Sequence, residues 1–218
     1  MAAAGEGPGP LPGDALAKRC AYAAAGLGGA NLVTLGLMYA VEVPRNGPYV
    51  FGAINDFGGG LYFLSSIPVL WQIHRQLDDD DSPLSRAALA AVVGSSVAAS
   101  GSSFLLAFHK IPFAPSTAVT VSTILVQSVW VTTVSTRLLR RGGWPKRLAR
   151  LGRGAGVAML AGLPILSLGY LAPGGSAVRK ALFAVGGTLG GAAWVSWPAW
   201  YLLVGRHLSA EASRAVRR

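Results

Sequence analysis

Six long apolar runs constrain this chain more than any other feature of its sequence. The hydrocarbon core of a bilayer is about 30 Å thick, and a helix needs about 20 residues to cross it. The runs near or above this length are residues 20–41, 49–73, 86–109, 113–136, 154–172 and 178–204. The sequence therefore predicts an all-α, polytopic membrane protein with a bundle of six transmembrane helices. Because the fifth run is short and the fourth is rich in Thr and Ser, five spans are the alternative.

The composition agrees with this class. Of the 218 residues, 52% are hydrophobic and 13% are charged, whereas a soluble domain has about 25% charged residues. The one cysteine, Cys20, excludes an intramolecular disulfide and gives no thiolate pair for a metal site. Few lysines, together with abundant alanine and glycine, are typical of a GC-rich bacterial genome. We therefore expect a multi-pass protein of the plasma membrane, which in a bacterium is the cytoplasmic membrane.

The basic residues predict the orientation of the spans. Of the 19 Lys and Arg residues, 15 lie before the first run, between the second and third, between the fourth and fifth, or after the sixth. The alternate connectors hold Arg45, Lys110, Arg179 and Lys180. Because cytoplasmic connectors carry the excess of Lys and Arg, both termini are expected in the cytoplasm. The net charge of +10 is then explained by topology and by anionic lipid headgroups at the cytoplasmic face, and nucleic acid is not an expected partner.

Three segments are expected along the chain. Residues 1–19, rich in Gly, Pro and Ala, are predicted to be a disordered cytoplasmic N-terminal segment. Residues 20–205 are predicted to form the six-helix transmembrane domain, and residues 206–218 a basic cytoplasmic tail. Since no connector is long enough for a separate catalytic domain, any chemistry is expected in or at the bilayer.

Two connectors on the cytoplasmic side are highly charged. In "DDDDSPLSR", residues 78–86, four adjacent acids repel one another, and Ser82 is predicted to cap the third span. A divalent-ion site is the alternative, although consecutive aspartates lack the spacing of a calcium loop. Residues 137–153 are predicted to form a short basic helix after Pro145 that lies on anionic lipid, with Trp144 as its anchor. A plain topology determinant explains these basic residues equally well.

Asp56 lies inside the second apolar run, in "GAINDFGGGLYF". It follows Tyr49 by seven residues, which is ~10 Å below the outer interface in a helix, where a charge facing lipid is unfavourable. We expect its side chain to face protein or water, with Asn55 about 100° around the helix. His109 lies at a comparable depth, and a carboxyl group beside a histidine could exchange protons near neutral pH. A static tie between the two spans is the alternative.

The fourth run carries a polar stripe. Ser116, Thr120, Thr123 and Gln127 recur at helical spacing and could line an aqueous path. Side chains of this kind also form hydrogen bonds between membrane helices. For Gln127 such a structural role is favoured over a role in a path.

Small residues predict how the spans pack together. In the sixth run, Gly186 with Gly190 and Gly187 with Gly191 form two small-xxx-small pairs. Such pairs allow two helix backbones to approach closely. Packing within the chain is favoured over a homodimer interface, which stays open as the alternative.

Aromatic residues are expected at the two membrane surfaces, where they form interfacial belts. Tyr39 and Tyr49 fall near the outer surface of the predicted topology. The residues that fall towards the inner surface are Tyr22, Trp71, Trp194, Trp197, Trp200 and Tyr201. These positions are typical of the two interfacial belts.

The sequence ranks three functions. The zinc signature H-E-x-x-H, the phosphate-binding G-x-x-x-x-G-K and the nucleophile elbow are absent, so no catalytic residue, metal ligand or cofactor is predicted. A structural, interaction or accessory component of the membrane ranks first. A small transporter or channel with a polar path lined by Asp56, Asn55, His109 and Gln127 ranks second, and a membrane-embedded enzyme third. Placement of both Asp56 and Gln127 on a cavity would favour the second function.

Overall fold

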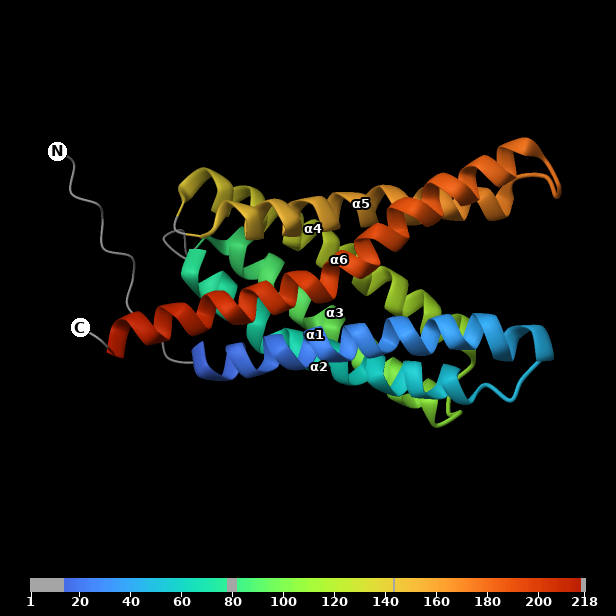
Figure 1. Cartoon of the computed structure of the whole chain (residues 1–218), viewed down its shortest axis with the longest axis horizontal. Helices are drawn as coiled ribbons and strands as arrows, with labels where there is room; N and C mark the ends of the chain where they lie inside the picture. Colours follow the sequence, from blue (N-terminus) through green and yellow to red (C-terminus); the bar gives the residue numbers. More distant parts are fainter. Residues whose placement is uncertain (1–13, 78–81, 143, 217–218) are drawn as a thin grey trace.

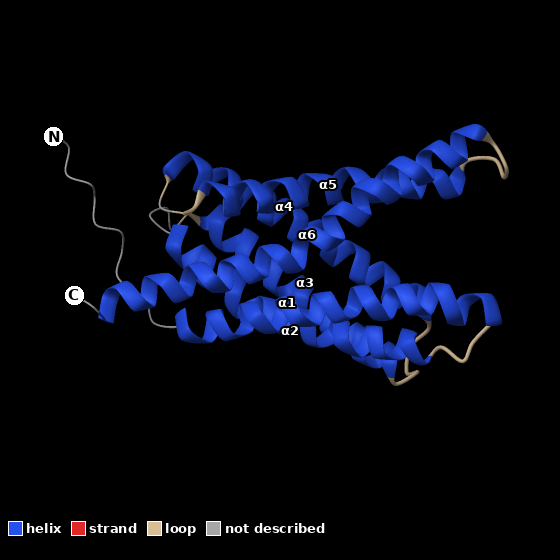
Figure 2. Ribbon diagram, viewed as in Figure 1, coloured by secondary structure: helices blue, strands red, loops and turns tan. Residues whose placement is uncertain are grey.

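The computed structural model describes residues 14–77, 82–142 and 144–216. These residues form a bundle of helices without a strand (Figures 1 and 2). The α-helices are α1 (Asp14–Leu37), α2 (Val50–Leu77), α3 (Pro83–Ala107), α4 (Phe113–Arg141), α5 (Lys146–Leu171) and α6 (Ala177–Val216). Between α1 and α2 the chain forms a π-helical turn, η1 (Met38–Glu42), and a 3-10 turn, η2 (Val43–Arg45). The predicted all-α class is confirmed for the described residues.

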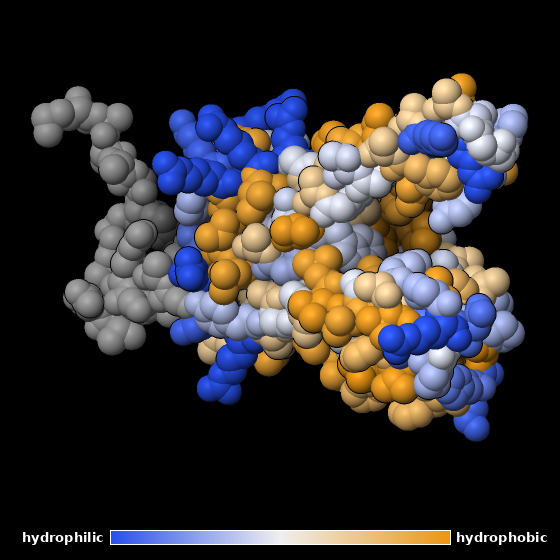
Figure 3. Space-filling view, turned by 45° about the vertical axis from the view of Figure 1, so that its right-hand side comes forward, coloured by the Kyte–Doolittle hydropathy of each residue, from blue (hydrophilic) through white to orange (hydrophobic). Residues whose placement is uncertain are grey.

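Each apolar run coincides with one of these helices. The segments long and apolar enough to cross a membrane are Asp14–Arg45, Leu84–Ala107, Phe113–Arg141 and Lys146–Leu171. Helices α2 and α6 are also long, at 28 and 40 residues, but their glycines, tryptophans and polar residues lower their mean hydropathy. Hydrophobic residues cover much of the middle of the molecule, and hydrophilic residues gather at its two ends (Figure 3). By length and composition, four helices suit a bilayer.

Both ends of the chain contain more helix than expected. Helix α1 begins at Asp14, so residues 14–19 of the segment predicted to be disordered are helical. The start of the helix is held by a buried hydrogen bond, in which Gln72 Nε2 donates to the Asp14 carboxylate at 2.6 Å. Residues 1–13 lie outside the described part of the chain. Helix α6 continues to Val216, so the predicted tail is helical as far as that residue.

The basic connector is not a separate interfacial helix. Helix α5 begins at Lys146, so the predicted basic helix is the first turns of α5, and its Leu148 is buried in the bundle. Trp144, expected to anchor in lipid, donates from Nε1 to Gln76 Oε1 at 3.0 Å. Its ring also contacts the His207 ring in a tilted arrangement, with 4.8 Å between the centroids. Trp144, in the connector between α4 and α5, therefore contacts both α2 and α6.

The acidic connector is described only in part. Ser82 caps α3 as predicted, because its Oγ accepts a hydrogen bond from Ser85 N at 3.2 Å. Arg141 holds the end of α2 by donating from Nη1 to Leu77 O at 2.5 Å. The four aspartates at residues 78–81 lie outside the described residues, so the divalent-ion alternative is untested.

The helices form a ring in the order of the chain. Each helix packs against the next, and α1 packs against α6 to close the ring. The closed half is the end that holds the start of α1 and the end of α6. The open half is the end that holds the connectors at residues 38–49, 108–112 and 172–176. There the α5–α6 hairpin diverges from α1 to α4 (Figure 1).

Large side chains fill the closed half. Leu70 and Ile73 of α2 and Trp200 and Tyr201 of α6 are each at most 1% exposed and belong to one core. The rings of Trp200 and Tyr201 meet edge to face, with 5.0 Å between their centroids. Trp200, expected near the inner membrane surface, packs its ring inside the bundle.

Glycines let α5 and α6 touch backbone to backbone. A Cβ on Gly162 would lie 2.7 Å from Gly190 N, and a Cβ on Gly186 would lie 2.6 Å from Leu166 N. The first glycine pair of α6 therefore packs within the chain, as predicted. The other pair, which begins at Gly187, is exposed, and a Cβ on Gly187 would meet no atom within 4 Å. A homodimer through that pair stays a prediction.

Candidate functional site

A cavity of about 740 Å³ occupies the open half. All six helices and η1 contribute to its lining, and Figure 3 shows a hollow between the two lobes at this end. The predicted polar candidates Asn55, Asp56, His109 and Gln127 all line it. His109 lies at the mouth, in the connector after α3, and Gln127 lies at the floor, where it is 2% exposed.

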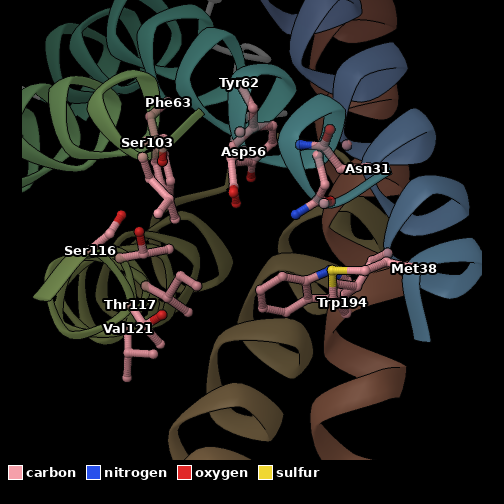
Figure 4. A pocket seen from close by; sticks show the side chains of 18 of the residues that line it. Asn31, Met38, Asp56, Tyr62, Phe63, Ser103, Ser116, Thr117, Val121 and Trp194 are labelled. Atoms are coloured by element: carbon pink, nitrogen blue, oxygen red, sulfur yellow. The ribbon is translucent and has the colours of Figure 1, made fainter. Parts of the chain in front are cut away.

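Asp56 points into the cavity from the first turns of α2 (Figure 4). Its side chain is half-buried. No hydrogen bond or ion pair joins it to any other residue that the structure describes. A half-buried carboxyl group without a partner is uncommon, because charged groups removed from water are usually paired or hydrogen-bonded. Asp56 is therefore the candidate residue most available to a ligand.

The residues around Asp56 place further polar groups on the same space. Gly59, one turn along α2, lies between Ser103 and Asn31: a Cβ on it would be 3.8 Å from Ser103 Oγ and 4.0 Å from Asn31 Nδ2. Figure 4 shows Asn31 and Ser103 on either side of Asp56. Asn55 has a different contact, since Thr34 Oγ1 donates to its Oδ1 at 3.3 Å. Asn55 thus links α1 to α2, while Asp56 stays unpaired within the described chain.

Glu42 fixes the start of α2 and with it the position of Asp56. The Glu42 carboxylate is buried and accepts hydrogen bonds from Phe51 N at 2.8 Å and Gly52 N at 3.2 Å. These amides belong to the first turn of the helix, where backbone donors have no partner within the helix itself. Glu42 was not among the residues predicted from the sequence, although an acid in the short connector before an apolar run could have indicated it.

His109 and Asp56 line one cavity but do not form the predicted pair. Helix α3 ends at Ala107, so His109 lies in a turn with a left-handed backbone (φ 55°), and it is exposed. Among the described residues no hydrogen bond or ion pair joins the two side chains. The expected proton exchange therefore has no direct contact to support it.

Gln127 forms the floor of the cavity by joining three helices. Its Nε2 donates to Ser96 Oγ of α3 at 2.9 Å and to Ser66 Oγ of α2 at 3.4 Å. Ser96 Oγ in turn donates to Val92 O at 2.7 Å. Gln127 thus has both of the roles weighed for it, because it ties helices together and lines the cavity.

The rest of the α4 stripe divides between the two roles. Ser102 Oγ donates to Ser116 Oγ at 3.0 Å, and Thr123 Oγ1 donates to Ser95 O at 2.9 Å, so both positions bond to α3. Thr120 lines the cavity and has no hydrogen bond to another described residue. The spacing of these residues predicted the stripe, but it did not predict that α3 would be the helix to which they bond.

Aromatic rings of α2 and α6 line the cavity. Trp194 and Trp197 of α6 and Tyr62 of α2 belong to the lining. The ring of Tyr62 lies edge to face with Tyr201, with 5.7 Å between the centroids. Trp197 is 6% exposed. Trp194 and Trp197, expected near the inner membrane surface, thus line the cavity, and their i, i+3 spacing places them on one face of α6.

The charge of the lining differs from that of the whole chain. The net charge of the protein is +10, yet the described lining includes no Lys or Arg and no carboxylate other than Asp56. Within the described residues, no three His, Cys, Asp or Glu side chains come close enough together to hold a metal ion. The site is therefore a mostly apolar cavity with one acid, several aromatic rings and a few amides and hydroxyls.

Comparison with protein-family models, curated proteins and solved structures finds no match to this chain. The function is therefore inferred from the geometry of the cavity alone.

Proposed function

We propose that this protein transports a small solute across the bacterial cytoplasmic membrane, with six spans and both termini in the cytoplasm. The open half then faces outwards, and the closed half faces the cytoplasm. The exposed basic residues of the closed half support this orientation, since Lys and Arg are retained on the cytoplasmic side. They belong to the α4–α5 region and are Arg137, Arg140, Lys146, Arg147, Arg150 and Arg153. The same residues would contact anionic lipid headgroups.

The cavity is the observation that carries the proposal. It is lined by all six helices, includes both Asp56 and Gln127, and measures about 740 Å³. Sites for small molecules are typically cavities of ~300–1,000 Å³ with a few placed polar groups. In many transporters a central site opens to one side of the membrane at a time. A structural or accessory component, which the sequence ranked first, has no need of such a cavity; that role stays a prediction.

The closed half favours a transporter over an open channel. On the closed side of Gln127, large buried side chains fill the space between the helices: Leu70, Ile73, Trp200 and Tyr201. Solute release on that side requires these side chains to separate, which is a conformational change and not free diffusion. A membrane enzyme, ranked third, gains no support from Asp56 and His109, because no hydrogen bond or ion pair joins them in the described structure.

Uptake into proteoliposomes tests the proposal. Purified protein is reconstituted, and a panel of radiolabelled cations, anions and neutral solutes is offered. The expected result is uptake of at least one solute above that of protein-free vesicles. Two cysteine variants in a Cys20→Ala background then locate the path. A bulky, membrane-impermeant maleimide should block uptake through Thr120→Cys, which lines the cavity, and not through Val129→Cys, which is 54% exposed on the same helix outside the lining.

Two results would contradict transport through the cavity. One is the absence of uptake for every solute of the panel in vesicles where Thr120→Cys still reacts with the maleimide. The other is uptake that continues unchanged after this modification, because solute would then not pass through the cavity.

A further inference from the structure

We infer that the cavity binds an organic monocation, with the cationic nitrogen against Asp56 and the apolar body against Tyr62, Trp194 and Trp197. This inference rests on the proposed function, because it names the substrate class of the same site.

Charge supplies the first argument. Asp56 is the one carboxylate of the described lining, and no Lys or Arg is present there to neutralise it. A cavity with charge of one sign and low-dielectric walls attracts ligands of the opposite sign. An anion would meet the carboxylate without any cation of the described lining to balance it. The lining therefore favours a cationic ligand. Because the described lining has one carboxylate, we expect the ligand to carry one positive charge.

The contrast between the two acids of the open half supplies the second argument. Glu42 is committed to the backbone amides of Phe51 and Gly52. Asp56 has no hydrogen bond or ion pair with a described residue and points into the cavity (Figure 4). A half-buried carboxylate gains most from a partner that replaces the water it has lost. A bound ammonium group would be that partner.

The aromatic rings supply the third argument. Tyr62 and Trp194 lie on different helices around the space that Asp56 faces (Figure 4), and Trp197 lies one turn further along α6. The face of such a ring attracts a cation and also offers apolar surface to the rest of a ligand. A cavity of about 740 Å³ is far larger than a bare inorganic ion requires. The combination fits an amine or a quaternary ammonium compound with an apolar body.

Tryptophan fluorescence gives a direct binding test. The protein is placed in nanodiscs of phosphatidylglycerol, which contain no quaternary ammonium lipid, and benzyltrimethylammonium is titrated. Benzyl alcohol serves as the neutral probe, benzenesulfonate as the anionic probe, and sodium chloride as the inorganic ion. We expect saturable quenching by benzyltrimethylammonium, and binding of the other probes at least ~10-fold weaker.

Matched variants assign the binding to the proposed residues. Asp56→Asn should weaken binding of benzyltrimethylammonium at least ~10-fold, whereas Glu211→Gln, which removes one acid from the end of α6 remote from the cavity, should leave it unchanged. Trp194→Leu should weaken it about 3-fold or more through the lost ring. Trp71→Leu is the control, since Trp71 is 52% exposed and lies outside the lining.

The outcomes separate this inference from the proposal of transport. Equal affinity for the neutral or anionic probe, or unchanged affinity in Asp56→Asn, would overturn the cation assignment and leave transport of another solute intact. Selective cation binding without uptake into proteoliposomes would support the assignment and overturn transport. If quenching is lost in Trp194→Leu, isothermal titration calorimetry separates loss of the reporting ring from loss of binding, and an affinity equal to that of the parent would overturn the role of Trp194.

Discussion

The two halves of the bundle differ in what lies between the helices. In the closed half, buried side chains such as Leu70, Trp200 and Tyr201 fill the centre of the ring. In the open half the centre is a cavity lined by polar and aromatic groups, and the α5–α6 hairpin stands apart from α1 to α4 (Figure 1). The same six helices therefore provide a packed base at one end and a binding space at the other.

The difference follows from residue size and from the kind of contact between helices. Apolar side chains gain little by leaving lipid for protein, so membrane helices depend on close backbone approach and interhelical hydrogen bonds. Helices α5 and α6 use the first device at Gly162 and Gly186. Helices α2, α3 and α4 use the second through Ser96 and Gln127. Gln127 lines the cavity and Gly162 precedes Leu163 of the lining, so the packing of the helices also shapes the site.

Breaking the contact between α5 and α6 should have the largest effect. In Gly162→Leu the new side chain would begin 2.7 Å from Gly190 N, so the helices must separate, and we expect a loss of about 3 kcal/mol in the free energy of unfolding. Thermal unfolding in detergent micelles measures it. Gly187→Leu is the control, because its Cβ would meet no atom within 4 Å. Equal losses in the two variants would contradict the backbone contact.

Removing the polar floor should have the next largest effect. Gln127→Leu eliminates the donors to Ser96 and Ser66, and we expect a loss of about 1 kcal/mol in the free energy of unfolding. Thr120→Val changes a cavity residue without a hydrogen bond to the described chain and should cost less than about 0.5 kcal/mol. Chemical unfolding in micelles compares the two variants, and so compares the floor of the cavity with a residue that only lines it. A cost for Thr120→Val as large as that for Gln127→Leu would contradict it.

Loss of the Glu42 cap should act locally in the open half. In Glu42→Ala the amides of Phe51 and Gly52 lose their acceptor, so we expect their hydrogen exchange to become roughly 10-fold faster. Exchange at Ile73, in the closed half, should not change. Mass spectrometry of exchanged peptides resolves the two regions. Uniform acceleration along α2 would show that the halves are not independent.

Asp56→Asn should have the smallest effect on stability. Since Asp56 has no hydrogen bond or ion pair with a described residue, its neutral isostere should change the free energy of unfolding by less than about 0.5 kcal/mol. Unfolding of the parent and of the variant under identical micelle conditions measures the difference. A loss above about 2 kcal/mol would instead support a static structural tie for this acid.

The helices were predictable from the sequence because apolar runs of bilayer length leave few other folds. The pairing of Gly186 with α5 was also predictable in kind, since small residues mark close helix approach. The start of α1 was not, because Asp14 is held by Gln72, a residue distant in the chain that no local pattern indicates.

The candidate site was predictable in its polar members and not in its aromatic ones. Asp56 and Gln127 stand out because polar groups are unfavourable in lipid. Tryptophan suits both a lipid interface and the lining of a cavity. Only the packing of α6 shows that Trp194 and Trp197 line the cavity. His109 was placed too deep, because the turn that ends α3 at Ala107 depends on the backbone and not on hydropathy.

Thiol labelling in intact cells tests the central claim most directly, namely that the open half is a water-filled cavity facing outwards. In a Cys20→Ala background, Thr120→Cys should react with a membrane-impermeant maleimide in intact cells. Arg137→Cys, exposed in the closed half, should react only after the cells are permeabilised. Labelling of Arg137→Cys in intact cells, or failure of Thr120→Cys to react in intact cells, would contradict the account.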